Sequence, residues 1–184
     1  KHGLKVEFAP EHFPVMINEV LDAFDVFRDL KNPKYFDGTF GRGGHFRTVK
    51  ELIPQMSAVV FDQDLQAIQF AKETFSTEVQ NQRLQVIHAN FAQFSEYNLG
   101  NFDMMLLDLG VSSPQLDQAE RGFSFYQDGP LDMRMNQFEG VTAEFLVNTL
   151  SEQELIRLFK EFGEVYNPYR VVRAIVHDRK TKAF

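Results

Sequence analysis

The chain contains a glycine-rich turn and a spaced acidic residue that together could hold a nucleoside. Residues 37 to 45, Asp-Gly-Thr-Phe-Gly-Arg-Gly-Gly-His, combine glycines, which let a ligand approach the main chain, with a helix start that offers free N–H groups. Asp62 lies 19 positions after Gly43. Nucleotide-binding βαβ units place an acid about 20 residues on, where it accepts hydrogen bonds from ribose hydroxyls. The glycine turn alone could be a tight turn without a ligand, and the acids of Asp62-Gln63-Asp64 alone could cap a helix, with Asp64 as the N-cap. These explanations account less well for the two motifs together.

Two later positions could complete such a site at the ends of further strands. Phe91 follows a predicted strand over residues 84–88, where an aromatic ring can stack on an adenine, although a Phe in this place is more often a core residue. Asp108 ends the next predicted strand and would face the crevice where ligands bind in open α/β sheets. Ser112 and Gln115 add hydrogen-bonding groups in the following loop, and ordinary loop chemistry also explains them.

An irregular segment over residues 120–135 mixes aromatic, basic and acidic side chains. Such segments can bind single-stranded nucleic acid through stacking and phosphate contacts. Pairing of Arg121 and Arg134 with Asp128 and Asp132 is an equally good explanation, so the sequence leaves both open.

The composition is that of an ordinary globular protein. The 184 residues are 43% hydrophobic and 24% charged, and no run approaches the ~18 to 20 apolar residues of a membrane span. No signal-peptide pattern opens the chain, and neither a membrane nor a metal is expected as a partner. The lack of cysteine excludes disulfides and thiolate chemistry from this chain and fits a cytoplasmic location. The net charge of -7 argues mildly against nucleic acid, yet residues 165–184 carry five basic residues and one acid.

Alternating helical and strand-like segments predict a parallel α/β sheet over the first two-thirds of the chain. The expected strands are residues 34–37, 58–61, 84–88 and 104–107. The second of these is a continuous apolar run, which is typical of a strand covered on both faces. A first helix is expected to begin near Pro14, before the first strand. Between the strands, one helix is expected to end before Pro54 and another to span residues 66–75.

The sequence changes in character after Gly110. Residues 111–140 are rich in Gly, Pro, Ser, Asp and Gln, which predicts an ordered loop with short helices. Ser151 and Glu154 have the spacing of a capping box, and Gly163 is expected as a C-cap. The expected helices are residues 142–149, 152–162 and about 168–179.

Several strings in the chain resemble the ribosomal RNA small-subunit cytidine-N4 methyltransferase family (RsmH, also called MraW). They are GTFGRGGH, DQD, NF, LLDLGVSSPQLD, ERGFSF and DGPLDMRM, together with the opening residues His12-Phe13-Pro14-Val15 and Glu19-Val20-Leu21. LLDLGVSSPQLD and RGFSF with DGPLDMRM are long and unusual, so chance is a poor explanation. The resemblance implies methyl transfer from S-adenosylmethionine to the exocyclic N4 amine of a cytidine in small-subunit (16S-type) ribosomal RNA. The implied partner is that RNA or the assembled small subunit.

The resemblance also implies a set of cofactor-binding residues. These are Gly43, Gly44, His45, Asp62, Phe91, Asp108 and Gln115. Within the set, Asp62 would hold the ribose hydroxyls and Phe91 would pack on the adenine. These positions agree with the turn and the strand-end residues singled out above.

The family has a class I S-adenosylmethionine-dependent methyltransferase fold, a Rossmann-like α/β sheet with a helical substrate-recognition insert after the fourth strand. By this resemblance, residues 1–112 are the N-terminal part of the methyltransferase domain and residues 113–184 are an incomplete insert. The family continues past the position of Phe184, so the chain is expected to be a fragment whose strands form the contiguous set 3-2-1-4. The fourth strand would then have an open edge through which the chain could self-associate.

One departure from the family pattern lies before the last expected helix. Residues 163–168, Gly-Glu-Val-Tyr-Asn-Pro, stand where the family usually has Gly-Glu-Glu-Arg and a basic helix. The role of that usual arginine is therefore not expected here.

The implied reaction is a direct displacement, in which the cytosine amine attacks the methyl carbon of the sulfonium. The lone pair of the amine is delocalised into the ring, so an acceptor near its N–H bonds would favour the attacking form. Asp108 is the first candidate for this catalytic role, and Ser112 or a loop carbonyl is the second. Positioning would contribute most of the acceleration, up to ~7 to 11 kcal/mol. Methylation of a ring carbon normally uses a thiolate, which this chain lacks.

RNA is expected to bind a basic face on the last helix, because contacts with phosphates favour Lys and Arg. The residues of this face would be Arg170, Arg173, His177 and Lys180, with Arg121 and Arg134 nearer the target base. A solvated helix face explains the same residues equally well.

Three other functions fit parts of the sequence. A truncated, non-catalytic S-adenosylmethionine-binding module that acts through protein contacts would share the whole site. A dinucleotide-dependent oxidoreductase would share the glycine turn and the spaced acid. A DNA amino-methyltransferase is disfavoured, because Asp108 is followed by Leu109-Gly110-Val111 in place of the usual Pro-Pro-aromatic string.

Overall fold

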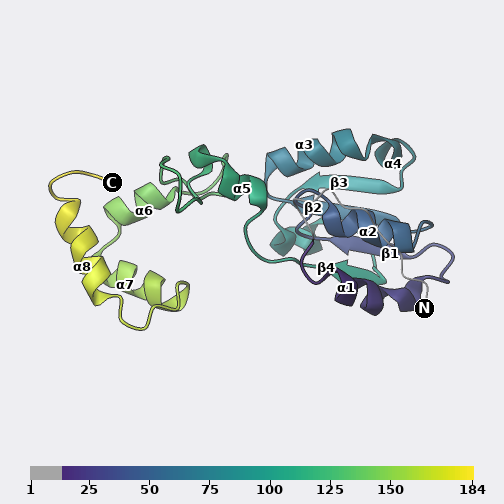
Figure 1. Cartoon of the computed structure of the whole chain (residues 1–184), viewed down its shortest axis with the longest axis horizontal. Coiled ribbons are helices and arrows are strands. Elements are labelled where there is room, and N and C mark those ends of the chain that lie inside the picture. The colour runs from purple at the N-terminus through teal and green to yellow at the C-terminus, as the bar shows by residue number, and fades with distance from the viewer. Residues whose placement is uncertain (1–13) are drawn as a thin grey trace. The chain divides into compact units, whose positions relative to one another are not determined.

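A four-stranded parallel sheet organises the first part of the protein (Figure 1). The computed structural model describes residues 14–184, so His12 and Phe13 of the opening motif lie outside the described residues. The strands are β1 (Lys34–Asp37), β2 (Ser57–Asp62), β3 (Leu84–His88) and β4 (Met104–Leu106). Every neighbouring pair is parallel and the order is β3-β2-β1-β4, which confirms the predicted strand set.

The order of the strands determines where a ligand is expected. The chain moves outward from β1 through β2 to β3 and then returns to place β4 on the other side of β1. The direction of winding therefore reverses between β1 and β4. In open α/β sheets, ligands bind beyond the carboxyl ends of the strands at this switch point.

Short helices connect the strands. They are α1 (Ile17–Phe24), α2 (Gly44–Leu52), α3 (Leu65–Thr74) and α4 (Ser76–Gln80), with 3₁₀ helices η1 (Asp25–Phe27) and η2 (Phe91–Tyr97). The first helix begins at Ile17 and not near Pro14, because Met16 is left-handed (φ 52°) and interrupts the chain before it. Asp64 caps α3 by accepting a hydrogen bond from the Gln66 backbone N–H at 2.9 Å, as the sequence suggested.

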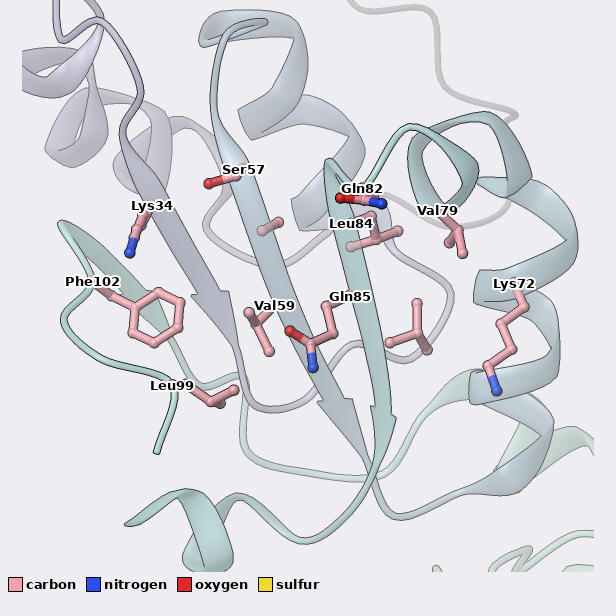
Figure 2. Close-up of a pocket in the computed structure, with 12 residues that line it drawn as sticks. Lys34, Ser57, Val59, Lys72, Val79, Gln82, Leu84, Gln85, Leu99 and Phe102 are labelled. Carbon is pink, nitrogen blue, oxygen red and sulfur yellow. The ribbon is translucent and has the colours of Figure 1, made fainter. Parts of the chain in front are cut away.

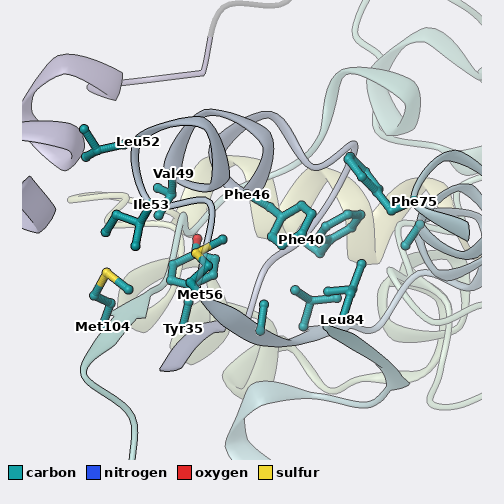
Figure 3. Close-up of a cluster of buried hydrophobic side chains, with 13 residues drawn as sticks. Tyr35, Phe40, Phe46, Val49, Leu52, Ile53, Met56, Phe75, Leu84 and Met104 are labelled. Carbon is teal, nitrogen blue, oxygen red and sulfur yellow. The ribbon is translucent and has the colours of Figure 1, made fainter. Parts of the chain in front are cut away.

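Each face of the sheet has its own apolar cluster, because successive strand residues point to opposite sides. Tyr35 belongs to the larger cluster, which α1, α2 and α3 cover; there the rings of Phe40, Phe46 and Phe75 pack against one another (Figure 3). Phe36 belongs to the cluster on the other face, which packs against η2 and the segment after it.

β4 is paired on one side only within residues 14–184. Its neighbour is β1, and Met105 is exposed on it. The edge expected from the sequence is therefore present in the described chain, while self-association through it stays a prediction.

Contacts group the chain into two compact units, one ending at Gly110 and the other spanning Val111–Phe184. The helices of the second unit are α5 (Ser113–Asp117), α6 (Ala143–Thr149), α7 (Glu152–Glu161) and α8 (Tyr169–Asp178), with the 3₁₀ helix η3 (Ala119–Arg121). Leu155 of α7 and Val172 of α8 are its buried apolar residues. Among residues 14–184, no helix has the length and apolar character needed to cross a membrane.

The ends of α7 show one correct and one wrong prediction. Ser151 and Glu154 form the expected capping box. Gly163 is not a left-handed C-cap; the left-handed residue is Glu164 (φ 52°). A side chain at Gly163 would lie 2.8 Å from the Phe159 carbonyl oxygen, so this glycine provides room for the chain to fold back over the helix end.

Replacing Phe36 by alanine should strongly destabilise the first unit. The side chain is 2% exposed, and its ring centroid lies 4.8 to 5.5 Å from those of Phe61, Phe94 and Phe102. A buried Phe→Ala change costs about 3 to 5 kcal/mol. Urea unfolding should show this loss, and Val26→Ala, at a side chain that is 77% exposed, should change stability by less than about 0.5 kcal/mol. Equal stability of the two variants would contradict the packing of this cluster.

Candidate functional site

The turn between β1 and α2 leaves one side of its backbone open. Gly41 (φ 56°) and Gly43 (φ 69°) are left-handed, a conformation that favours glycine. A side chain added at Gly43 would lie 2.6 Å from the Phe40 ring, whereas one added at Gly41 would meet no atom within 4 Å. The surface of the turn at Gly41 is therefore accessible to a ligand.

Gly38 brings three segments together at the start of this turn. Its N–H donates to the Leu106 carbonyl at 3.0 Å, which continues the pairing of β1 with β4. A Cβ at this position would lie 2.4 Å from the Leu107 side chain and 2.9 Å from Cβ of Phe91. The end of β1, the end of β4 and the beginning of η2 are therefore in close contact, and the predicted site residue Phe91 lies beside the turn.

Asp62 ties the end of β2 to the same turn. Its Oδ2 accepts a hydrogen bond from the Gly41 N–H at 2.7 Å, and its Oδ1 accepts one from the Asp64 N–H at 2.8 Å. Burial raises the pKa of Asp62, and these backbone hydrogen bonds oppose the rise. A carboxylate has about four acceptor positions, so Asp62 can also accept hydrogen bonds from a ligand.

A second set of hydrogen bonds joins the ends of β2 and β3 and positions the start of η2. The Gln63 carbonyl lies 2.8 Å from Nε2 of His88, and the Gln63 side-chain oxygen accepts a hydrogen bond from the Asn90 amide at 3.0 Å. Asn90 also forms a capping box with Gln93 at the N-terminus of η2. Phe91 is the first residue of that helix, so the hydrogen bonds of the capping box fix the backbone next to it.

His45 and Asp108 face each other across the β1–β4 switch point. Nδ1 of His45 lies 3.9 Å from Oδ2 of Asp108, and its Nε2 lies 2.9 Å from the Val15 carbonyl. A carbonyl only accepts, so Nε2 donates to it, and Nδ1 is the ring nitrogen that faces the carboxylate. The two atoms are close enough for one donor group of a ligand to contact both.

The structure adds two site residues that the sequence analysis missed, Asp37 and Thr39. Asp37 is 1% exposed; its carboxylate accepts hydrogen bonds from the Tyr35 hydroxyl and the Thr39 N–H, both at 3.0 Å. Burial raises its pKa to about 6, although these hydrogen bonds and nearby His45 lower it. The Thr39 hydroxyl accepts a hydrogen bond from the Asp108 N–H at 2.7 Å. An Asp followed two positions later by a turn residue is the pattern of an Asx-turn and was the available signal.

Ser112 and Gln115 lie in the second unit. They form a capping box at the start of α5, where the Gln115 side chain accepts a hydrogen bond from the Ser112 N–H at 2.9 Å. Their membership of the same site as the first-unit residues stays a prediction.

The two predicted arginines of the irregular segment hold that segment together. Arg121 is 1% exposed, and its guanidinium donates to the carbonyls of Arg134 and Met135 at 3.1 and 3.0 Å. Arg134 forms a bidentate ion pair with Asp132, at 2.9 and 2.7 Å. Of the two explanations left open by the sequence, pairing of Arg134 with Asp132 is confirmed, and RNA contact by either arginine stays a prediction.

The predicted basic face on α8 is solvent-exposed. Arg170 on α8 and Lys180, which follows the end of α8, are exposed, and Arg173 is exposed while forming an ion pair with Glu152 of α7 at 3.5 Å. His177 contacts Asp178, with its Nδ1 3.0 Å from the carboxylate. These groups are accessible to an RNA backbone.

A cavity of about 640 Å³ lies away from these residues (Figure 2). It is lined by Lys34, Ser57, Leu84 and Phe102, which lie at or near the amino ends of the strands. Ligands of parallel sheets bind at the opposite, carboxyl ends, so this cavity is not the candidate site. Within residues 14–184, no group of three or more His, Asp or Glu side chains is placed to hold a metal ion.

Comparison with known proteins assigns the family. The profile of the MraW methylase family matches residues 9–184. The chain belongs to this family. Its sheet order agrees with a class I S-adenosylmethionine-dependent methyltransferase fold. The family resemblance drawn from the sequence motifs is thereby confirmed.

Curated relatives of this chain carry the name ribosomal RNA small subunit methyltransferase H. The protein of Bdellovibrio bacteriovorus is 70% identical over 184 residues, which are 100% of this chain and 56% of the relative. That of Methylobacillus flagellatus is 44% identical over 92% of this chain and 52% of the relative, and that of Shewanella denitrificans is 42% identical over 97% and 56%. The chain spans about half the length of the curated relatives it matches.

Replacing Asp37 by asparagine should remove a pH dependence of stability. A carboxyl whose pKa rises from 3.8 to about 6 on folding binds more protons in the folded than in the unfolded state between these values. Its contribution to stability therefore falls as pH rises from about 4 to about 6, by up to about 3 kcal/mol. The difference in unfolding free energy between wild type and Asp37→Asn should change across this range and level off above it. A difference that stays constant from pH 4 to pH 7 would contradict the assignment.

Proposed function

We propose that this chain takes part in methyl transfer from S-adenosylmethionine to the N4 amine of a cytidine in small-subunit ribosomal RNA, in the cytoplasm. The observation that carries the proposal is the convergence of Gly41, Asp62, Phe91 and Asp108 at the carboxyl ends of the strands around the switch point. The names of the relatives add the class of substrate, since each is called a ribosomal RNA methyltransferase.

The first-unit residues fit the parts of S-adenosylmethionine. The free acceptor positions of Asp62 suit the ribose hydroxyls, and the open backbone at Gly41 allows close approach. Phe91 supplies a ring beside the turn for the adenine. His45 Nδ1 and Asp108 Oδ2 are two acceptors for the ammonium of the methionine part. Bound there, the cofactor supplies a methyl group on a positively charged sulfur.

Asp108 is placed for a second task in the transfer step. The cofactor would supply its methyl group to the cytosine amine and leave as the neutral thioether, and the amine would pass one proton to an acceptor beside it or to water. Asp108 lies two residues after the end of β4, and its partly exposed carboxylate can accept a hydrogen bond from the amine. Ser112 or a loop carbonyl is the alternative acceptor. The main contribution of these groups is orientation.

The second unit supplies the expected RNA surface. Arg170, Arg173 and Lys180 provide positive charge on a protein whose net charge is -7. Arg121 and Arg134 order the loop that they share, and in this proposal that loop lies near the target base. Electrostatic contacts with phosphates would supply affinity, and the loop would supply selectivity.

The decisive experiment measures cofactor binding and methyl transfer together. Calorimetry should show binding of S-adenosylmethionine, and incubation with small ribosomal subunits should yield N4-methylated cytidine by nucleoside mass spectrometry. Asp62→Asn should weaken cofactor binding by about 10- to 100-fold, because it removes charged hydrogen bonds. Asp103→Asn is the matched control: this carboxylate also accepts a backbone N–H, from Lys34 at 2.8 Å, but at the amino end of the sheet.

Three outcomes would count against the proposal. Binding without transfer would favour the non-catalytic module, and stronger binding of NADH than of S-adenosylmethionine would favour the oxidoreductase. Equal weakening by Asp62→Asn and Asp103→Asn would show that the loss comes from general damage to the sheet.

Reversing the charge of α8 should weaken RNA binding in a salt-dependent way. The double change Arg170→Glu and Arg173→Glu should lower affinity for small-subunit RNA by at least about ten-fold and reduce the slope of log affinity against log salt by about 2. Arg28→Glu with Lys31→Glu makes the same charge change on the first unit and should have little effect. Unchanged affinity and slope in the α8 variant would remove this helix from the RNA surface. Filter binding at several salt concentrations measures both quantities.

A further inference from the structure

A continuous series of hydrogen bonds runs from the interior of β1 to Asp108. The Tyr35 hydroxyl donates to Oδ2 of Asp37 at 3.0 Å, and Oδ1 of Asp37 accepts from the Thr39 N–H at 3.0 Å. The Thr39 hydroxyl in turn accepts from the Asp108 N–H at 2.7 Å. Tyr35 and Asp37 are buried, so the series is anchored in the core of the first unit.

The last of these bonds acts where the β-ladder has ended. The pairing of β1 with β4 closes with the hydrogen bond from Gly38 to the Leu106 carbonyl, and Asp108 lies two residues further on. The neighbour Leu107 packs against Gly38, whereas Leu109 is exposed. The Thr39 hydroxyl therefore adds a direct hydrogen bond to the Asp108 backbone where the β-ladder no longer provides one.

We propose that Thr39 and Asp37 are positioning residues for Asp108. The Thr39 hydroxyl determines where the Asp108 backbone lies at the end of β4, and the buried Asp37 carboxylate determines where Thr39 lies. The consequence for cofactor and amine rests on the proposed function, whereas the positioning itself is a property of the free protein.

Positioning matters here because the Asp108 carboxylate is directed toward His45. Nδ1 and Oδ2 are 3.9 Å apart, so one donor group of a ligand can contact both. A small shift of the Asp108 backbone changes this separation and removes one of the two acceptors from reach. Displacements of about 1 Å can cost a site on the order of 100-fold in rate.

The protonation state of Asp37 should affect the position of Asp108 through the same hydrogen bonds. The ionised carboxylate accepts from both Tyr35 and Thr39, whereas a protonated one has an oxygen that donates. The titratable groups that face it are Tyr35 on β1, His45 on α2 and Asp62 at the end of β2. Burial raises the pKa of Asp37 to about 6, so its change of state falls in an accessible range.

The test compares Thr39→Val, which removes the acceptor, with Thr39→Ser, which keeps it. Hydrogen exchange of the Asp108 amide in the free protein should become about ten-fold faster in Thr39→Val and stay near wild type in Thr39→Ser. Thr48→Val is the matched control, because it removes a buried hydroxyl that donates to the Gly44 carbonyl on α2. Unchanged Asp108 exchange in a folded Thr39→Val protein would overturn the proposal.

A pH titration of amide chemical shifts supplies the second measurement. The Thr39 and Asp108 amides of wild type should titrate together with a midpoint near 6, and both transitions should be absent in Asp37→Asn. This measurement carries the test if Thr39→Val does not fold. A pH-dependent shift of the Thr39 amide without one of the Asp108 amide would contradict the coupling between Asp37 and Asp108.

Cofactor affinity then separates a positioning role from a merely structural one. Thr39→Val should weaken S-adenosylmethionine binding by about ten-fold, Thr39→Ser should restore it to within about three-fold, and Thr48→Val should leave it unchanged. Failure of every protein, wild type included, to bind the cofactor would refute the proposed function, while the amide measurements would still decide the positioning claim. Normal affinity in a Thr39→Val protein whose Asp108 amide has lost protection would refute the link to the ligand.

Discussion

The site depends on one steric constraint, the absence of a side chain at Gly38. Atoms of Leu107, Phe91 and Phe36 lie within 2.4 to 3.2 Å of the place where a Cβ would stand. Three segments that are distant in sequence can meet only because this space is free. The close approach brings the end of β4 and the start of η2 against the glycine turn, and it places Phe91 and Asp108 around one switch point.

Much of the first unit could be predicted because its strands carry strong local signals. Residues 34–37 and 84–88 were predicted with the bounds that the structure shows, and the strand order followed from the family resemblance. The wrong predictions concern helix ends, where a single residue with left-handed backbone determines where the helix begins or ends. Met16 delays α1 and Glu164 takes the conformation expected of Gly163, and neither residue type signals a positive φ.

In the candidate site too, residues with a local sequence signal were predicted, and residues joined by contacts between distant positions were missed. The glycine turn, Asp62 and Phe91 were predicted, since each follows a strand end at a characteristic spacing. Asp37 and Thr39 were missed as site residues because the Asx-turn pattern marks only a local turn, and the hydrogen bond across 69 positions, from Asp108 to Thr39, leaves no pattern in the sequence. The burial of Arg121 was also hidden, since a guanidinium that donates to backbone carbonyls looks like a nucleic-acid ligand in sequence alone.

The contact between His45 and Val15 links the beginning of the described chain to the candidate site. The Val15 carbonyl selects which imidazole nitrogen carries hydrogen, and Pro14 lies against Gly44, where an added Cβ would be 2.7 Å from its ring. Trimming or fusing the protein at this point would free the imidazole to exchange tautomers and to rotate. The backbone at Val15 therefore helps to determine which ring nitrogen of His45 faces Asp108.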